Sequence, residues 1–63
     1  MPTEMLKRYI GEKVNVMCSG SAVGFDGTLI SVEENWIMIE ERKNTRIING
    51  DTITYITIKK EYK

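Results

Sequence analysis

Apolar and polar residues alternate along most of this chain, in five short segments separated by turn-forming residues. Alternation with a period of two is typical of strands that bury one face of a sheet. The breaks between segments carry glycine, asparagine, serine or clusters of charge, which favour turns. The pattern predicts strands at residues 13–18, 22–32, 36–41, 45–49 and 52–58. Short strands at this spacing predict an all-β fold, a strongly bent five-stranded antiparallel barrel.

The longest predicted strand, 22–32, changes phase along its length. Its apolar residues keep one parity up to Leu29 and take the opposite parity at Ile30 and Val32. Because two glycines also lie within this strand, we expect a bulge or a sharp bend there. Alternation places the following side chains inside the barrel: Val14, Val16, Cys18, Leu29, Ile37 or Met38, Ile53 and Ile56.

The N-terminal segment predicts a short helix, about residues 3–10. Thr3 is a favourable N-cap, and the apolar residues that follow recur at helical spacing. Gly11 is the expected stop, because glycine readily takes the left-handed conformation that ends helices. Such a short helix is stabilised mainly by packing, so we expect it to cover one end of the barrel.

The chain is too short to be very stable without support. A domain of 63 residues buries only about 60% of its unfolded surface. Small domains commonly add disulfides, a metal or oligomerisation. A single cysteine excludes an internal disulfide, and the absence of histidine excludes a Cys/His zinc cluster. We therefore expect one domain, 1–63, that associates with copies of itself.

Catalysis, cofactors and membranes are not indicated. Without histidine the usual acid–base group near neutral pH is missing, so we expect no enzyme, no catalytic residue and no cofactor. Glu33 and Glu34 are adjacent carboxylates with no further acid placed to complete a metal site, so we expect no metal. No apolar run approaches a membrane span, and no signal peptide is apparent. These observations and the free Cys18 favour the cytoplasm.

Charge is balanced overall but segregated along the chain. Nine basic residues offset nine acidic ones, yet residues 19–41 carry five acids and no base, whereas residues 42–63 carry six bases and two acids. Zero net charge argues against binding nucleic acid by bulk electrostatics. The segregation allows copies of the chain to attract one another and leaves a local basic patch possible.

Three segments resemble the Sm-like (LSm) family of small β-barrels. They are 9–16 (YIGEKVNV), 27–29 (GTL) and 48–56 (INGDTITYI), the last of which follows the closing pattern of that family with Asn49 in place of its arginine. The Lys-His signature of the bacterial RNA chaperone Hfq is absent, since the chain has no histidine. The chain resembles a divergent, bacterial-type member of the Sm-like family.

The resemblance implies a fold, an assembly and a binding site. The fold is a five-stranded barrel capped by a helix, and the assembly is a homo-oligomeric ring in which the fourth strand of one copy pairs with the fifth strand of the next. RNA, or a small anionic ligand, would bind near the central pore, through the loop after the second strand and the turn before the last. The implied RNA-binding residues are Asn35, Trp36, Asn49 and Gly50, with Glu33 standing for the family's loop aspartate.

Each of these residues also has a purely structural interpretation. Trp36 could stack on a base, or fill the barrel or a subunit interface. Asn35 could contact a ligand or simply form a turn. Asn49-Gly50 is in itself a type I′ turn signal. The alternative function is an SH3-like module for protein–protein interaction or scaffolding, with no nucleic acid bound.

Overall fold

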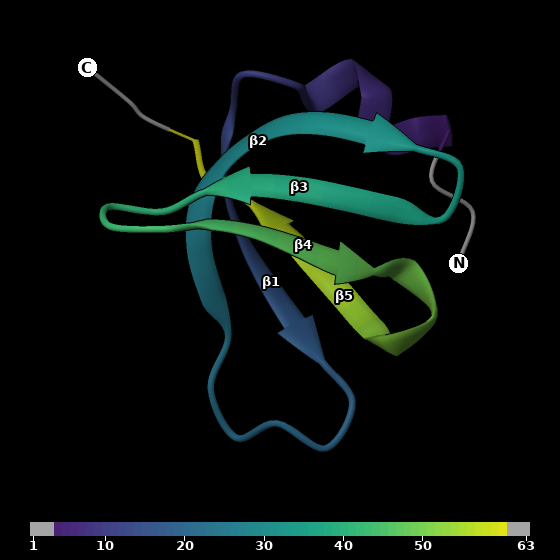
Figure 1. Cartoon of the computed structure of the whole chain (residues 1–63), viewed down its shortest axis with the longest axis vertical. Coiled ribbons are helices and arrows are strands. Elements are labelled where there is room, and N and C mark those ends of the chain that lie inside the picture. The colour runs from purple at the N-terminus through teal and green to yellow at the C-terminus, as the bar shows by residue number, and fades with distance from the viewer. Residues whose placement is uncertain (1–3, 61–63) are drawn as a thin grey trace.

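The computed structural model describes residues 4–60 as a single antiparallel sheet of five strands (Figure 1). Its order is β4-β3-β2-β1-β5, so each strand from β1 to β4 pairs with its neighbour in sequence, and β5 returns to pair with β1. The strands are β1 (Lys13–Cys18), β2 (Phe25–Glu33), β3 (Trp36–Glu40), β4 (Thr45–Asn49) and β5 (Ile53–Ile58). The predicted all-β, five-stranded antiparallel fold is confirmed. No helix among residues 4–60 is long and apolar enough to cross a membrane.

The expected irregularity of the second strand is present in β2. The register between β2 and β3 shifts between Leu29 and Ser31, so Leu29 and Val32 both point inward while Ile30 is partly exposed. The strand begins at Phe25 rather than at residue 22, and Val23 lies exposed in the loop before it. The shift bends β2 (Figure 1), which lets one strand contribute to both sides of the core.

The barrel interior follows the predicted alternation closely. The buried core consists of Leu6, Val14, Val16, Leu29, Val32, Ile37, Ile39, Ile48 and Ile53. Cys18 and Ile56, also expected inside, are partly buried and pack against this core. On β3 it is Ile37 that is buried, whereas Met38 lies on the opposite face.

The N-terminal helix is a 3-10 helix, η1 (Glu4–Tyr9). Leu6 is its buried residue and joins the core, so η1 packs on the sheet as expected. The proposed cap Thr3 lies outside the described residues. Gly11 ends the segment with a φ of 99°, and its amide donates to the carbonyl of Leu29 (2.7 Å). The left-handed conformation that this turn needs is the one that glycine adopts without strain.

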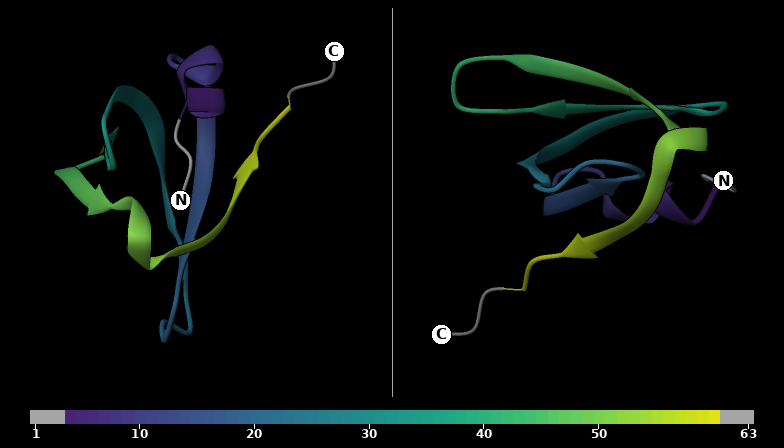
Figure 2. Two further views of the ribbon diagram at one scale, coloured as in Figure 1. Left: turned by 90° about the vertical axis from the view of Figure 1, so that its right-hand side faces the viewer. Right: turned by 90° about the horizontal axis from the view of Figure 1, so that it is seen from below.

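The sheet does not close into a complete barrel. β4 and β5 lie at the two ends of the strand order and form no ladder with each other. They are joined by the short 3-10 helix η2 (Gly50–Thr52), after which β5 runs away from β4 (Figure 2). Within residues 4–60 the fold therefore keeps two strand edges that no other strand covers.

Candidate functional site

The two predicted site loops are brought together by their asparagines. Asn35 lies between β2 and β3, and Asn49 is the last residue of β4. Asn35 donates from Nδ2 to Oδ1 of Asn49 (2.9 Å), and the amide of Gly50 donates to the carbonyl of Asn35 (2.6 Å). One side-chain and one backbone hydrogen bond thus fix the two loops to each other.

Asn49 also begins the next element. Its Oδ1 accepts a second hydrogen bond, from the amide of Asp51 (2.9 Å), so its side chain caps η2. Asn49 is extended, with φ −74° and ψ 123°, whereas a type I′ turn would need positive φ at its central residues. The expectation of a type I′ turn at Asn49-Gly50 is therefore wrong. A cap that satisfies an otherwise unpaired amide selects a 3-10 turn instead.

Gly50 is required by the closeness of the two loops. A Cβ atom at this position would lie 2.5 Å from Oδ1 of Asn35 and 2.8 Å from its carbonyl oxygen. Any side chain would therefore push the β2–β3 turn away from Asn49.

One donor and one acceptor of the asparagine pair stay available. Within residues 4–60, Oδ1 of Asn35 and Nδ2 of Asn49 have no hydrogen-bond partner. The structure contains no buried side-chain polar atom without a partner among the described residues. Neither of these two groups is therefore fully buried, and Oδ1 of Asn35 lies against Gly50. A side-chain amide donor and a side-chain amide acceptor are the groups that pair with the edge of a nucleobase.

Trp36 lies beside this pair on the outer face of the sheet. It is opposite Asn49 in the β3–β4 ladder, and 49% of it is exposed. The interpretation that Trp36 fills the barrel is therefore wrong, because the alternation of β3 gives the interior to Ile37. Its ring borders a hollow of about 140 Å³ together with Met38 and Ile47.

The surroundings of the asparagine pair are acidic. Glu33 at the end of β2, Glu34 in the turn and Asp51 in η2 are all exposed, and residues 33–36 and 49–52 contain no basic residue. Glu34 has a φ of 52°, in the left-handed region that few non-glycine residues adopt, which makes the β2–β3 turn tight. These two segments therefore offer hydrogen-bonding groups to a ligand but contain no basic side chain for a phosphate.

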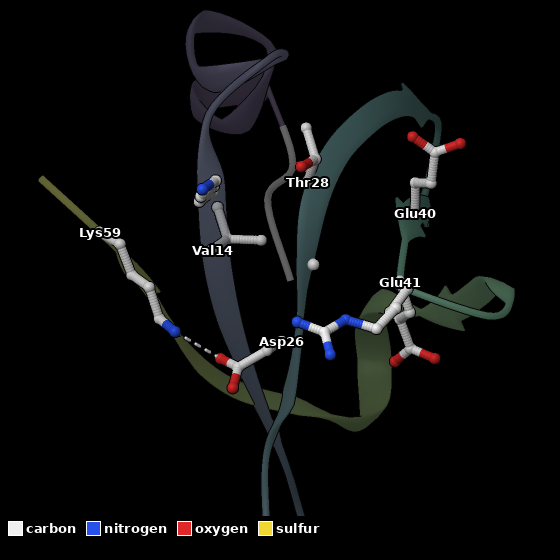
Figure 3. Close-up of a pocket in the computed structure, with 9 residues that line it drawn as sticks. Val14, Asp26, Thr28, Glu40, Glu41 and Lys59 are labelled. Carbon is white, nitrogen blue, oxygen red and sulfur yellow. Dashed lines mark ion pairs between the residues drawn. The ribbon is translucent and has the colours of Figure 1, made fainter. Parts of the chain in front are cut away.

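A second hollow, of about 370 Å³, lies at the opposite end of β3 (Figure 3). Lys59 reaches across it and pairs with Asp26 (2.9 Å), which also accepts a hydrogen bond from Asn15 (2.9 Å). The hydrogen bond from Lys59, aided by that from Asn15, lowers the pKa of Asp26. The charged residues that line the hollow are Lys13, Asp26, Glu40, Glu41, Arg42 and Lys59. No sequence pattern marks this group, because its members are distant in sequence and their charges compensate.

Glu33 and Glu34 are adjacent carboxylates, a residue type that can bind metal ions. Across the described part of the chain, no group of three or more His, Cys, Asp or Glu side chains is placed to hold a metal ion.

Comparison with known proteins identifies a family. The family model described as Domain of unknown function (DUF6897) matches residues 3–62, so the chain belongs to this family. No curated protein and no solved structure matches the chain.

Proposed function

We propose that this member of the DUF6897 family assembles into a homo-oligomeric, Sm-like ring and binds single-stranded RNA at the Asn35–Asn49 pair, near the central pore. The observation that supports this binding site is the 2.9 Å hydrogen bond between the two asparagines. It joins the two loops that the resemblance assigns to RNA, and it leaves one donor and one acceptor open.

The assembly is supported by the two uncovered strand edges. β4 has five residues and β5 has six, so the edges are nearly equal in length and can pair along most of their extent. Each edge also carries an exposed large side chain, Ile47 on β4 and Tyr55 on β5. Uncovered edges invite pairing with another chain, and a ring satisfies every edge at once.

The binding mode follows from what the site offers. Nδ2 of Asn49 donates to a base and Oδ1 of Asn35 accepts from it, while the acidic residues nearby keep phosphates at a distance. Binding therefore depends on contacts with the base rather than on release of counterions, and its dependence on salt is shallow.

The test is Asn49→Asp. Aspartate keeps an oxygen where Asn35 and the Asp51 amide donate, but replaces the free amino group by a second acceptor. We expect the affinity for short oligouridylate, measured by fluorescence anisotropy at two salt concentrations, to fall by about tenfold or more, since a base contact contributes about 1–3 kcal/mol. The mass of the assembly, measured by light scattering, stays unchanged.

Val23→Asp is the matched control, because it adds the same charge at an exposed position in the β1–β2 loop and should bind RNA like the wild type. The double variant Asn35→Ala/Asn49→Ala should also lose its affinity for RNA, while the mass of its assembly stays that of the ring. If the wild type binds no single-stranded RNA even at low salt, the protein-interaction alternative replaces this proposal. If the double variant falls apart, the asparagines serve only the turns.

A further inference from the structure

The outer face of β2, β3 and β4 forms a regular grid of side chains. The registers place Glu33, Trp36 and Asn49 in one row across the three strands. The next row consists of Ser31, Met38 and Ile47, and the third of Thr28, Glu40 and Thr45. None of these nine residues is basic.

The centre of the grid is an exposed apolar groove. Trp36 is 49% and Ile47 is 58% exposed, and Met38 between them is partly buried. These three side chains border the hollow of about 140 Å³, whose surface is mainly apolar. Exposed apolar patches with a polar rim are typical of protein interaction sites.

Two carboxylates lie on this face of the sheet, one at the groove and one further along β3. Glu33 borders the hollow itself. Glu40 lies two rows away on the same face and also lines the larger hollow, together with Lys13, Arg42 and Lys59. Neither carboxylate is in an ion pair with any residue of 4–60. An apolar groove flanked by two unpaired carboxylates is complementary to an apolar side chain flanked by two cations.

We propose that this groove is a docking site for an extended segment of a partner protein, in which an apolar side chain lies between two basic ones. Residues i, i+2 and i+4 of an extended chain point to the same side and span about 13 Å. The three rows of the grid cover the same span, because Trp36, Met38 and Glu40, one in each row, are themselves i, i+2 and i+4 of β3. The pattern is therefore basic-x-apolar-x-basic, with its cations at Glu33 and Glu40.

Charge also distinguishes this occupant from RNA. A strand of RNA that ran the length of the groove would bring its phosphates close to Glu33 and Glu40, with no basic residue among the nine of the grid to offset them, which opposes binding along the groove. A single base bound at the Asn35–Asn49 pair, as proposed above, places no phosphate there. This docking site goes beyond the proposed function and does not depend on the ring or on the asparagine pair.

The test uses the fluorescence of Trp36, which is the only tryptophan of the chain. The probes are capped peptides with the cores Lys-Ser-Leu-Ser-Lys, Lys-Ser-Ala-Ser-Lys and Glu-Ser-Leu-Ser-Glu. We expect the first to shift the emission to shorter wavelength, the second to bind about tenfold more weakly, as for a half-buried leucine, and the third to have no effect. High salt should weaken the binding of the first peptide.

Variants of the protein identify the residues involved. Ile47→Ser should lower the affinity for the first peptide about tenfold. Glu33→Gln and Glu40→Gln should each lower it about two- to fivefold, as for exposed ion pairs. Val23→Ser and Glu12→Gln are matched controls at exposed positions in other loops and should leave the affinity unchanged. Amide NMR spectra of each variant check that the fold is retained.

Three results would overturn the proposal. Equal binding of the acidic peptide would mean that the charge of a peptide does not determine whether it binds to the groove. A response of Trp36 to oligouridylate but to no peptide would assign the face to nucleic acid. An emission shift that follows protein concentration alone would mean that a second copy of this chain occupies the groove.

Discussion

Leu29 lies at the centre of the interior and joins the bent strand to β3 and to the segment that precedes β1. Its side chain is fully buried opposite Ile39, its amide donates to the carbonyl of Glu12 (3.0 Å), and its carbonyl accepts from Gly11 (2.7 Å). We expect Leu29→Ala to reduce the free energy of unfolding by about 2–5 kcal/mol, the range for a packed core leucine. Urea denaturation measures this loss.

Ile30→Ala provides the control for Leu29, because Ile30 lies at the bulge and is partly exposed. Its loss should be about 1 kcal/mol or less. A comparable loss for the two variants would mean that the inside and outside of β2 have been exchanged.

Individual residues also show which buried positions the alternation of the sequence can predict and which it cannot. Val14 and Val16 follow from alternation alone, because Asn15 between them lies on the other face. In the run from Trp36 to Ile39 both faces are apolar, so alternation could not choose between Ile37 and Met38. Only the pairing of β3 with its neighbours decides, and pairing is a tertiary property.

At the level of elements, the β3–β4 hairpin is closed by an ion pair. Arg46 donates to the two carboxylate oxygens of Glu41 from Nε (2.9 Å) and Nη2 (3.2 Å), and its guanidinium lies 4.2 Å from the centre of the Phe25 ring. The hydrogen bonds from Arg46 lower the pKa of Glu41 below its usual 4.5. The carboxylate therefore contributes stability above pH 4.5, and this contribution is lost as the pH falls through the lowered pKa of the folded state.

We predict that Glu41→Gln lowers the melting temperature at pH 5–7, and that the difference from the wild type narrows as the pH falls below 4.5. Thermal melts of both proteins across this pH range measure the effect. Glu40→Gln, one residue away and in no ion pair with the described residues, should show a smaller difference from the wild type at every pH. A gap for Glu41→Gln that does not change with pH would mean that the ion pair does not stabilise the hairpin.

The connections between elements show where local rules stop. The β3–β4 turn at residues 42–44 was expected from its polar residues and is present, with the amide of Glu41 donating to the carbonyl of Asn44 (2.7 Å). Asn49-Gly50 carries an equally strong local signal, yet forms η2. The difference arises from Asn35, fourteen residues away, whose contacts with Asn49 and Gly50 no local pattern contains. The same contacts create the candidate site, so its geometry was as hard to predict as the turn.

For the whole molecule, the decisive feature is the open sheet. The sequence predicted the strands and the bend, but a complete barrel would need a ladder between β4 and β5, and this ladder is absent. Alternation within strands determines which face is buried and says nothing about whether the first and last strands of a sheet meet. The two free edges are the structural basis for the proposed assembly.

The last prediction concerns these edges. Tyr55 is 52% exposed on the outer side of β5, and a lysine on an edge strand opposes pairing with another chain because the charge would have to be desolvated. We expect the wild type to sediment as an oligomer at micromolar concentration in physiological salt, and Tyr55→Lys to sediment as a folded single chain. Met5→Lys makes the same change at an exposed position of η1, away from both edges, and should remain an oligomer. A wild type with the mass of one chain would refute the assembly, and equal dissociation of both variants would place the contact elsewhere than on β5.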